Sequence, residues 1–145
     1  MATINEIQDQ IIEDFDLFDE WDEKYAYIID LGKKLPGIDA KYKIDENIIK
    51  GCQSLVWMVS TYKDGNVYFE GESDAIIVKG LVALLLKVLS GQPAEDIAKS
   101  DLYFIHKIGM EQHLSMTRSN GLASMVKQMK MHAMAYQSKA TQEKL

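Results

Sequence analysis

Cys52 is the side chain of this 145-residue sequence best suited to covalent chemistry, because it is the only thiol. Gly51 precedes it, and Gln53 and Ser54 follow it. Glycine lets the backbone turn tightly beside a reactive side chain, and the amide and hydroxyl groups can donate hydrogen bonds to a thiolate or to sulfur attached to it. The alternative is a small buried apolar residue, which is the commonest role of a lone cysteine. The four residues therefore predict either a reactive loop or a packing position.

Arg118 is the only arginine in a chain that contains fifteen lysines. Arginine presents a planar, permanently charged fork that lysine cannot replace in a bidentate or buried ion pair. We therefore predict that Arg118 contacts an anion or forms a buried ion pair. Asp74 is the acid that we expect to pair with it, although a carboxylate in the first turn of a helix is also explained by the helix dipole.

Metal, nucleotide and hydrolase sites have little support in the sequence. His106, His113 and His132 lack a metal-binding spacing, and one cysteine cannot complete a Cys-rich zinc or iron–sulfur site. No glycine segment has phosphate-loop spacing. A catalytic dyad of Cys52 and His113 would require the two side chains to meet, and no nucleophile-elbow pattern surrounds the cysteine. We predict that the chain binds no metal and no cofactor of its own.

Local patterns predict an α+β fold, with a small antiparallel sheet flanked by N- and C-terminal helices. Capping residues and apolar residues at helical spacing predict helices over residues 4–15, 21–35, 74–89, 94–99 and 101–108, and from residue 117 or 119 onward. Residues 55–62 and 67–69 predict a β-hairpin, because turn residues lie between them, and residues 42–49 predict a weaker third strand. Ser73 is the expected N-cap of the central helix.

Composition predicts one domain over residues 1–145, with a core of about 16–136 and a frayed polar tail over 137–145. The net charge of −6 argues against nucleic acid and anionic membrane surfaces as partners. No apolar stretch approaches the roughly 20 residues of a membrane-spanning helix. The N-terminus also lacks an export pattern, so we expect a cytoplasmic protein.

Four motifs of this sequence resemble those of the SufE family of sulfur acceptors, and they occur in the family's order. They are Trp21-Asp22-Glu23-Lys24-Tyr25 with Leu31-Gly32 and Leu35-Pro36, then Gly51-Cys52-Gln53-Ser54 with Val56-Trp57, then Ser73-Asp74-Ala75 with Val78-Lys79-Gly80-Leu81, and last His113-Leu114-Ser115 with Arg118-Ser119-Asn120-Gly121. The resemblance covers roughly residues 21–135. Four separate motifs in the right order are hard to obtain by chance.

The resemblance implies a small α+β domain similar to the IscU-type scaffold, with Cys52 as the sulfur-accepting cysteine. The residues that it implies as supporting the site are Gly51, Gln53, Ser54, Asp74, His113 and Arg118. It implies a SufS-like cysteine desulfurase as partner, and the pyridoxal phosphate belongs to that partner. It also implies delivery of the sulfur to a SufBCD-like iron–sulfur scaffold.

The sequence departs from the family in two features. Thr117 stands where the family more usually has serine, and the last helix is unusually rich in methionine. The late methionines are Met110, Met116, Met125, Met129, Met131 and Met134. They fit an adaptable binding surface or, more simply at Met125 and Met129, packing in the core.

Our first hypothesis is a sulfur carrier that accepts persulfide sulfur on Cys52 and passes it on for iron–sulfur cluster assembly. We expect the thiol to be covered at rest by the apolar residues that follow it. The alternative is a non-covalent adaptor that stimulates a cysteine desulfurase, with Cys52 merely buried. A stand-alone cysteine hydrolase or peroxidase is a weaker third hypothesis. The sequence leaves open whether the chain forms a homodimer.

Overall fold

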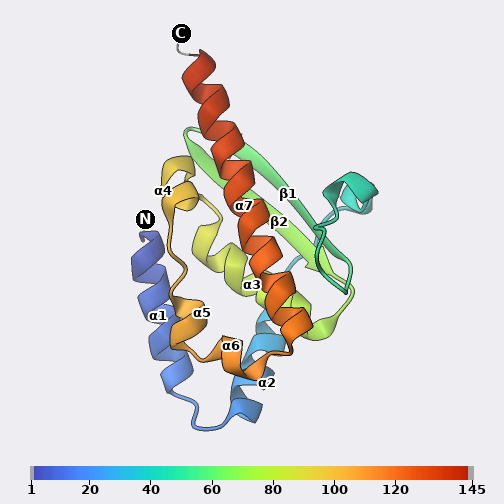
Figure 1. Ribbon diagram of the computed structural model, residues 1–145, viewed down its shortest axis with the longest axis vertical. Helices are drawn as coiled ribbons and strands as arrows, with labels where there is room; N and C mark the ends of the chain where they lie inside the picture. Colours follow the sequence, from blue (N-terminus) through green and yellow to red (C-terminus); the bar gives the residue numbers. More distant parts are fainter. Residues whose placement is uncertain (1, 144–145) are drawn as a thin grey trace.

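The computed structural model describes residues 2–143, with side chains described to residue 140. These residues form helices packed around and beside a three-stranded antiparallel sheet, so the predicted α+β fold class is confirmed (Figure 1). The elements in chain order are α1 (Ile4–Asp16), α2 (Trp21–Lys33), the 3-10 turns η1 (Ala40–Tyr42) and η2 (Asp45–Asn47), β1 (Val56–Lys63), β2 (Asn66–Ser73), α3 (Ile76–Leu89), β3 (Gln92–Pro93), α4 (Ala94–Lys99), α5 (Phe104–Lys107), α6 (Met110–His113) and α7 (Met116–Glu143).

The predicted hairpin is confirmed as β1 and β2, which pair in register from Val56 opposite Ser73 to Lys63 opposite Asn66. The turn between them is Asp64-Gly65, and both residues have positive φ, at 54° and 84°. Two left-handed residues match the right-handed twist of the flanking strands, which is why Asp-Gly favours this hairpin.

The third strand lies elsewhere than predicted. Residues 42–49 form 3-10 turns and one isolated bridge, Ile48 opposite Trp57, because the polar run Asp45-Glu46-Asn47 favours a turn. The third strand is instead β3, two residues long, where Gln92 pairs with Val67.

The centre of the molecule is α3, whose apolar residues are buried on most sides. It packs against α2 at backbone contact distance, since a Cβ on Gly80 would lie 2.2 Å from the Ile28 carbonyl oxygen. A Cβ on Gly32 would likewise lie 2.7 Å from the Gly80 nitrogen. These two glycines therefore permit the close helix crossing. The predicted N-cap role of Ser73 is wrong, because Ser73 ends β2 and the helix begins at Ile76.

Helix α7 has 28 residues, crosses the molecule beside the sheet and projects beyond it (Figure 1). Its C-terminal half is tied to β1, where Ser60 Oγ lies 2.8 Å from His132 Nδ1 and the Tyr136 hydroxyl donates to the Ser60 carbonyl at 3.0 Å. The helix extends through residue 143, further than the predicted start of the tail at 137, and residues 144–145 lie outside the described part.

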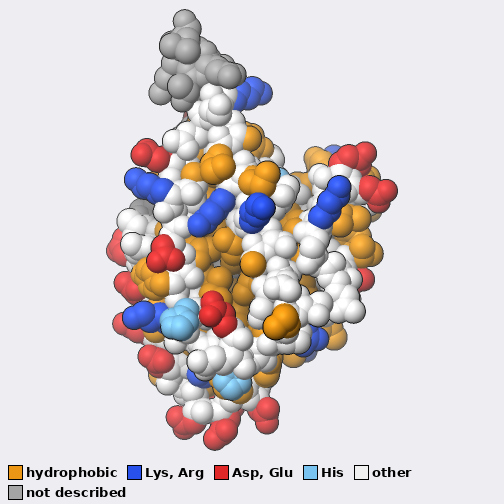
Figure 2. Space-filling view, in the orientation of Figure 1, with side chains coloured by type: hydrophobic (Ala, Val, Ile, Leu, Met, Phe, Trp, Pro, Cys, Tyr) orange, Lys and Arg blue, Asp and Glu red, His pale blue; other side chains and the backbone are white. Residues whose placement is uncertain are grey.

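Acidic side chains gather at the end of the molecule where α1 leads into α2 (Figure 2). The far end of α7 lies at the opposite end of the molecule. Among the described helices, none is long and apolar enough to cross a membrane.

Candidate functional site

Cys52 lies in residues 49–55, an irregular segment that leads into β1 and is called the Cys52 segment below, and Gly51 sets its path. Gly51 has a φ of +95°, a left-handed conformation that glycine adopts without strain. A Cβ at this position would also lie 2.4 Å from Ser124 Oγ on α7. Glycine is therefore required both by the backbone conformation and by the close approach of α7.

The Cys52 thiol is half-buried against α7. Its Sγ donates a hydrogen bond to the Gly121 carbonyl oxygen over 3.5 Å. A Cβ on Gly121 would lie 3.4 Å from the same Sγ, so a small residue lets the helix backbone face the thiol. Burial raises the pKa of the Cys52 thiol above its ordinary value, because the thiolate loses solvation there. Cys52 is therefore a partly covered thiol whose neutral form is favoured. Its cover differs from the predicted one, because Sγ faces Gly121 of α7, whereas Leu55, the first of the apolar residues expected to cover it, is 44% exposed.

A cavity of about 440 Å³ opens beside this thiol. The Cys52 segment, α3 and the start of α7 supply its walls. The lining residues are Cys52, Gln53, Ser54, Val78, Leu81, Ser115, Thr117, Arg118, Gly121 and Met125. The structure thus brings together four of the predicted site residues, and the one arginine of the chain lines the same cavity as the thiol.

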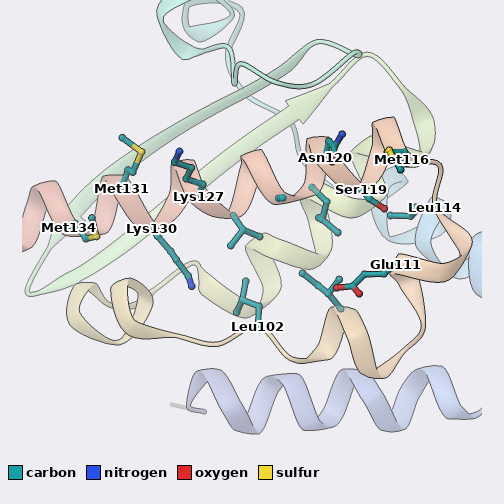
Figure 3. A pocket seen from close by; sticks show the side chains of 14 residues that line it. Leu102, Glu111, Leu114, Met116, Ser119, Asn120, Lys127, Lys130, Met131 and Met134 are labelled. Carbon is teal, nitrogen blue, oxygen red and sulfur yellow. The ribbon is translucent and has the colours of Figure 1, made fainter.

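A larger cavity, of about 910 Å³, lies along the opposite face of α7 (Figure 3). None of the predicted site residues lines it. Size alone therefore does not locate the chemistry, because the smaller cavity holds the only nucleophilic thiol of the chain.

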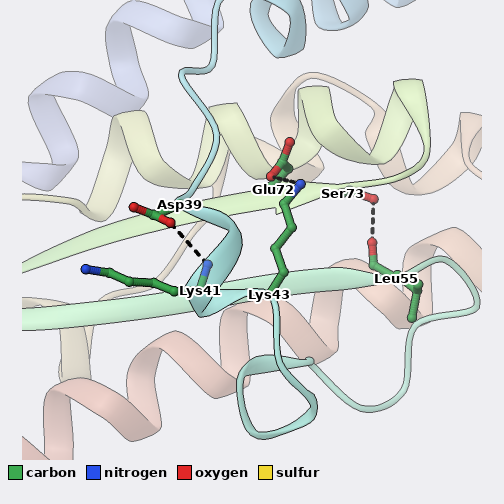
Figure 4. Close-up of polar contacts among 6 residues, drawn as sticks. All are labelled: Asp39, Lys41, Lys43, Leu55, Glu72 and Ser73. Atoms are coloured by element: carbon green, nitrogen blue, oxygen red, sulfur yellow. Dashed lines mark hydrogen bonds and ion pairs between the residues drawn. The ribbon is translucent and has the colours of Figure 1, made fainter.

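Asp74 fastens the end of the Cys52 segment instead of pairing with Arg118. The backbone N–H of Leu55 donates to Asp74 Oδ1 at 3.0 Å, and the Asp74 N–H donates to the Leu55 carbonyl at 3.3 Å. Ser73 Oγ donates to that same carbonyl at 2.8 Å (Figure 4). Leu55 is therefore held at both of its backbone groups, three residues after the thiol.

The predicted buried ion pair of Arg118 and Asp74 is wrong. Both side chains are exposed, and no ion pair joins them within the described residues. The physical reason is that the Asp74 carboxylate already accepts a backbone hydrogen bond at the end of β2. The other prediction for Arg118, contact with an anion, remains a prediction.

His113 does not line the Cys52 cavity, so the structure gives no support to a catalytic dyad of these two residues. Its ring stacks on Trp21, with the ring centres 4.1 Å apart and the planes at 23°. The Tyr25 hydroxyl donates to the His113 backbone carbonyl. His113 therefore ties α6 to α2 at the base of α7.

Sequence reasoning missed the residues at the start of α7. Ser115 Oγ accepts the backbone N–H of Arg118 at 3.2 Å, so Ser115 is the capping residue rather than Thr117 or Ser119. The sequence feature that could have identified this cap is the serine directly before Met116, the first residue of α7. Gly121 gave a second signal, since glycine inside a helix often marks a close approach.

Within the described residues, no three histidine, cysteine, aspartate or glutamate side chains gather as a metal site would require. The residues that line the Cys52 cavity supply one thiol and the thioether of Met125, and no carboxylate or imidazole. The geometry supports chemistry at sulfur, with one permanent positive charge nearby.

Comparison with known proteins identifies the family of this chain. The family model SufE, Fe-S metabolism associated domain, matches residues 9–133. An uncharacterized SufE-like protein of Rhizobium meliloti is 46% identical over 130 residues, which cover 86% of this chain and 93% of that protein. Another from Rhizobium etli is 47% identical over 131 residues, covering 86% and 88%.

A solved structure shares the fold. The solution structure of a hypothetical protein from Thermus thermophilus matches with a TM-score of 0.76, over 91% of this chain and 96% of that one. The two sequences are 17% identical, so this likeness concerns the fold alone.

Proposed function

The chain belongs to the SufE family, and on that premise we propose that it is a sulfur carrier that accepts persulfide sulfur on Cys52 from a SufS-like cysteine desulfurase. The family match confirms the resemblance seen in the sequence and associates the chain with iron–sulfur metabolism. The carrier acts in the cytoplasm and passes its sulfur to a SufBCD-like iron–sulfur scaffold. The observation that carries the proposal is the position of the only thiol, at the wall of a cavity that also holds Arg118.

The transfer is an exchange at sulfur. The Cys52 thiol loses its proton, and the thiolate attacks the outer sulfur of the donor's persulfide. A bond forms between Cys52 Sγ and that outer sulfur, while the bond between the two donor sulfurs breaks. The donor cysteine leaves as a thiolate and takes up a proton, so Cys52 ends as a persulfide with no net oxidation or reduction.

The charge and polarity of the cavity suit this step. Arg118 brings a permanent positive charge to the cavity in which a thiolate must form. Gln53 and Ser54 supply polar groups that can donate hydrogen bonds to sulfur. The absence of a second cysteine anywhere in the chain suits a carrier, because a neighbouring thiol would release the sulfur by forming a disulfide.

The resting state requires the partner to uncover the thiol. Burial favours the protonated form of Cys52, which is a poor nucleophile. A desulfurase that binds the uncovered conformation more tightly shifts the equilibrium toward it by the difference between its two affinities. Covering also keeps a loaded persulfide away from other thiols until the next partner binds.

A turnover experiment tests the proposal against the adaptor alternative. A limiting amount of SufS-like desulfurase is mixed with excess protein and cysteine, without added reductant, and alanine release is followed. A carrier gives a burst of alanine that rises in proportion to the amount of wild-type chain, and Cys52→Ser gives none. If Cys52→Ser stimulates alanine release as strongly as the wild type does, the chain is an adaptor and the carrier proposal fails.

A further inference from the structure

The 910 Å³ cavity on the far side of α7 is an elongated apolar groove that the sulfur chemistry does not use. Helix α7 forms one wall, and the other wall is formed by Leu102, Ile105, Glu111 and Leu114, so it is apolar apart from one carboxylate (Figure 3). In the space-filling view, apolar side chains lie in a hollow beside α7, with basic side chains along the α7 rim (Figure 2). The groove is thus a surface with an apolar floor and a charged edge.

The groove accounts for the unusual methionine content of the last helix. Met110, Met125 and Met129 are buried in the core, as expected for two of them. Met116, Met131 and Met134 line the groove and are 80%, 48% and 50% exposed. Flexible thioether side chains adapt to the shape of a partner, so exposed methionines along a groove indicate a contact surface.

The groove is shaped for a helix. Its α7 residues run from Met116 to Met134 on one face of the helix, a distance of about 27 Å at 1.5 Å per residue. A long apolar groove parallel to a helix is the geometry in which an amphipathic helix binds through apolar residues at every third or fourth position. A partner helix of about five turns would fill it.

The charges at the rim indicate which helix fits. Lys127 is exposed and Lys130 is half-buried, and both line the groove. Lys130 Nζ donates to the Ser100 carbonyl at 2.5 Å, across from α7. Neither lysine has a carboxylate within ion-pair distance among the described residues, whereas Lys43 on the sheet side pairs with Glu72 at 2.8 Å. The groove also holds one acid, Glu111, on the wall opposite α7, where its carboxylate lies 3.6 Å from His106 Nδ1. The α7 side of the groove is therefore its basic side, and two lysines without acidic partners there favour a ligand whose flank toward α7 is acidic.

We propose that this groove is a docking site for an acidic amphipathic α-helix of a partner protein. The apolar face of that helix packs on the exposed methionines and on Leu102, and its acidic flank meets Lys127 and Lys130. The α7 residues that line the groove and those that line the Cys52 cavity are different residues on opposite faces of the helix. Docking and sulfur acceptance can therefore be separated by substitution.

The test is a selection on the full-length protein. A displayed library of peptides of about 18 residues has leucine, isoleucine or phenylalanine fixed at helical spacing, while the flanking positions vary among acidic, basic and neutral residues. We expect the recovered peptides to carry Asp and Glu on one flank. Recovery of basic or uncharged flanks, or of no peptide that needs the groove, would overturn the proposal.

Matched variants show whether a recovered peptide uses the groove. Lys127→Glu should raise its Kd by about tenfold, whereas Lys139→Glu, an exposed lysine of the same helix outside the groove, should leave it unchanged. Met116→Ser should weaken binding, and Leu17→Ser should not, although both residues are 80% exposed. Equal effects within either pair would place the peptide elsewhere and contradict the proposal.

Two further measurements distinguish other occupants. The first is competition by palmitate. If palmitate displaces the peptide and binds the wild type with a lower Kd than any selected peptide does, the groove is a fatty-acid site. Self-association in the analytical ultracentrifuge that disappears in Met116→Ser would assign it to a second copy of the chain. Either result overturns the partner-helix proposal, and unchanged circular dichroism confirms that each variant is folded.

Discussion

The α2–α3 crossing and the Cys52 segment are held by different forces. At the crossing, Gly32 and Gly80 let two helix backbones touch, and the fully buried Ile28 packs into the contact. The Cys52 segment has no regular structure, and a few hydrogen bonds fix it, from Leu55 to the end of β2 and from Cys52 to α7. Tight packing gives a frame that moves only by unfolding, while a segment held by single hydrogen bonds of about 1 kcal/mol each can open alone.

This difference suits a carrier, because the thiol must be covered at rest and reachable during transfer. The frame keeps α3 in place as one wall of the cavity, and the start of α7 forms another wall. The segment between them carries the nucleophile. Substitutions in the two regions should therefore have distinct effects on stability and on the reactivity of Cys52.

The largest effect is expected at the helix crossing. Gly80→Ala places a Cβ 2.2 Å from the Ile28 carbonyl oxygen, so the helices must separate. We expect the free energy of unfolding to fall by about 3 kcal/mol or more, measured by urea denaturation. The control is Gly121→Ala, the same change in α7, where the new Cβ lies at an ordinary contact distance of 3.4 Å from Cys52 Sγ. Equal losses in the two variants would contradict the difference between frame and segment.

A smaller effect on stability, with a clear effect on reactivity, is expected at Asp74. Asp74→Ala removes the acceptor for the Leu55 N–H and should cost about 1 kcal/mol. If the substitution destabilises only the closed conformation of the Cys52 segment, the open conformation becomes about fivefold more populated. Alkylation of Cys52 by iodoacetamide should then become about fivefold faster. Glu70→Ala, which removes an exposed acid of β2, the strand that ends directly before Asp74, is the control. An unchanged alkylation rate in Asp74→Ala would show that this hydrogen bond does not hold the segment.

The smallest effect concerns the contact of α7 with the sheet. Burial lowers the pKa of His132 below its ordinary value of 6.5. The unfolded chain therefore binds a proton more readily than the folded chain, and stability is lost as the pH falls through 6.5 toward the lowered folded pKa. His132→Gln should reduce this loss in thermal melts between neutral and mildly acidic pH, and His106→Gln, an exposed histidine, should not. The same pH dependence in all three proteins would contradict this role of His132.

Local patterns predicted the parts of the fold that local physics determines. The Asp-Gly turn between two β-rich runs predicted the hairpin, and an almost wholly apolar segment predicted the buried helix α3. The third strand was placed wrongly, because a two-residue strand leaves no periodicity in the sequence. Pairing with β2 determines it, and that pairing depends on the whole fold.

The site was predicted only in part for a similar reason. The lone cysteine and lone arginine are visible in the composition, and the structure brings both to one cavity. The partner of Asp74 was predicted wrongly, because a search for opposite charges overlooks backbone N–H groups, which carry no sequence signature. The contact of Gly121 with Cys52 joins residues far apart in the chain, and no local pattern encodes it.

The most direct test of the account is to follow the sulfur atom itself. The protein is incubated with SufS-like desulfurase and cysteine labelled with a heavy sulfur isotope, then alkylated, digested and analysed by mass spectrometry. We predict that the peptide containing Cys52 gains one labelled sulfur, that no other peptide does, and that Cys52→Ser gains none. Label on another residue, or an unlabelled Cys52 peptide after the desulfurase has turned over, would contradict the assignment of this chain as a sulfur carrier.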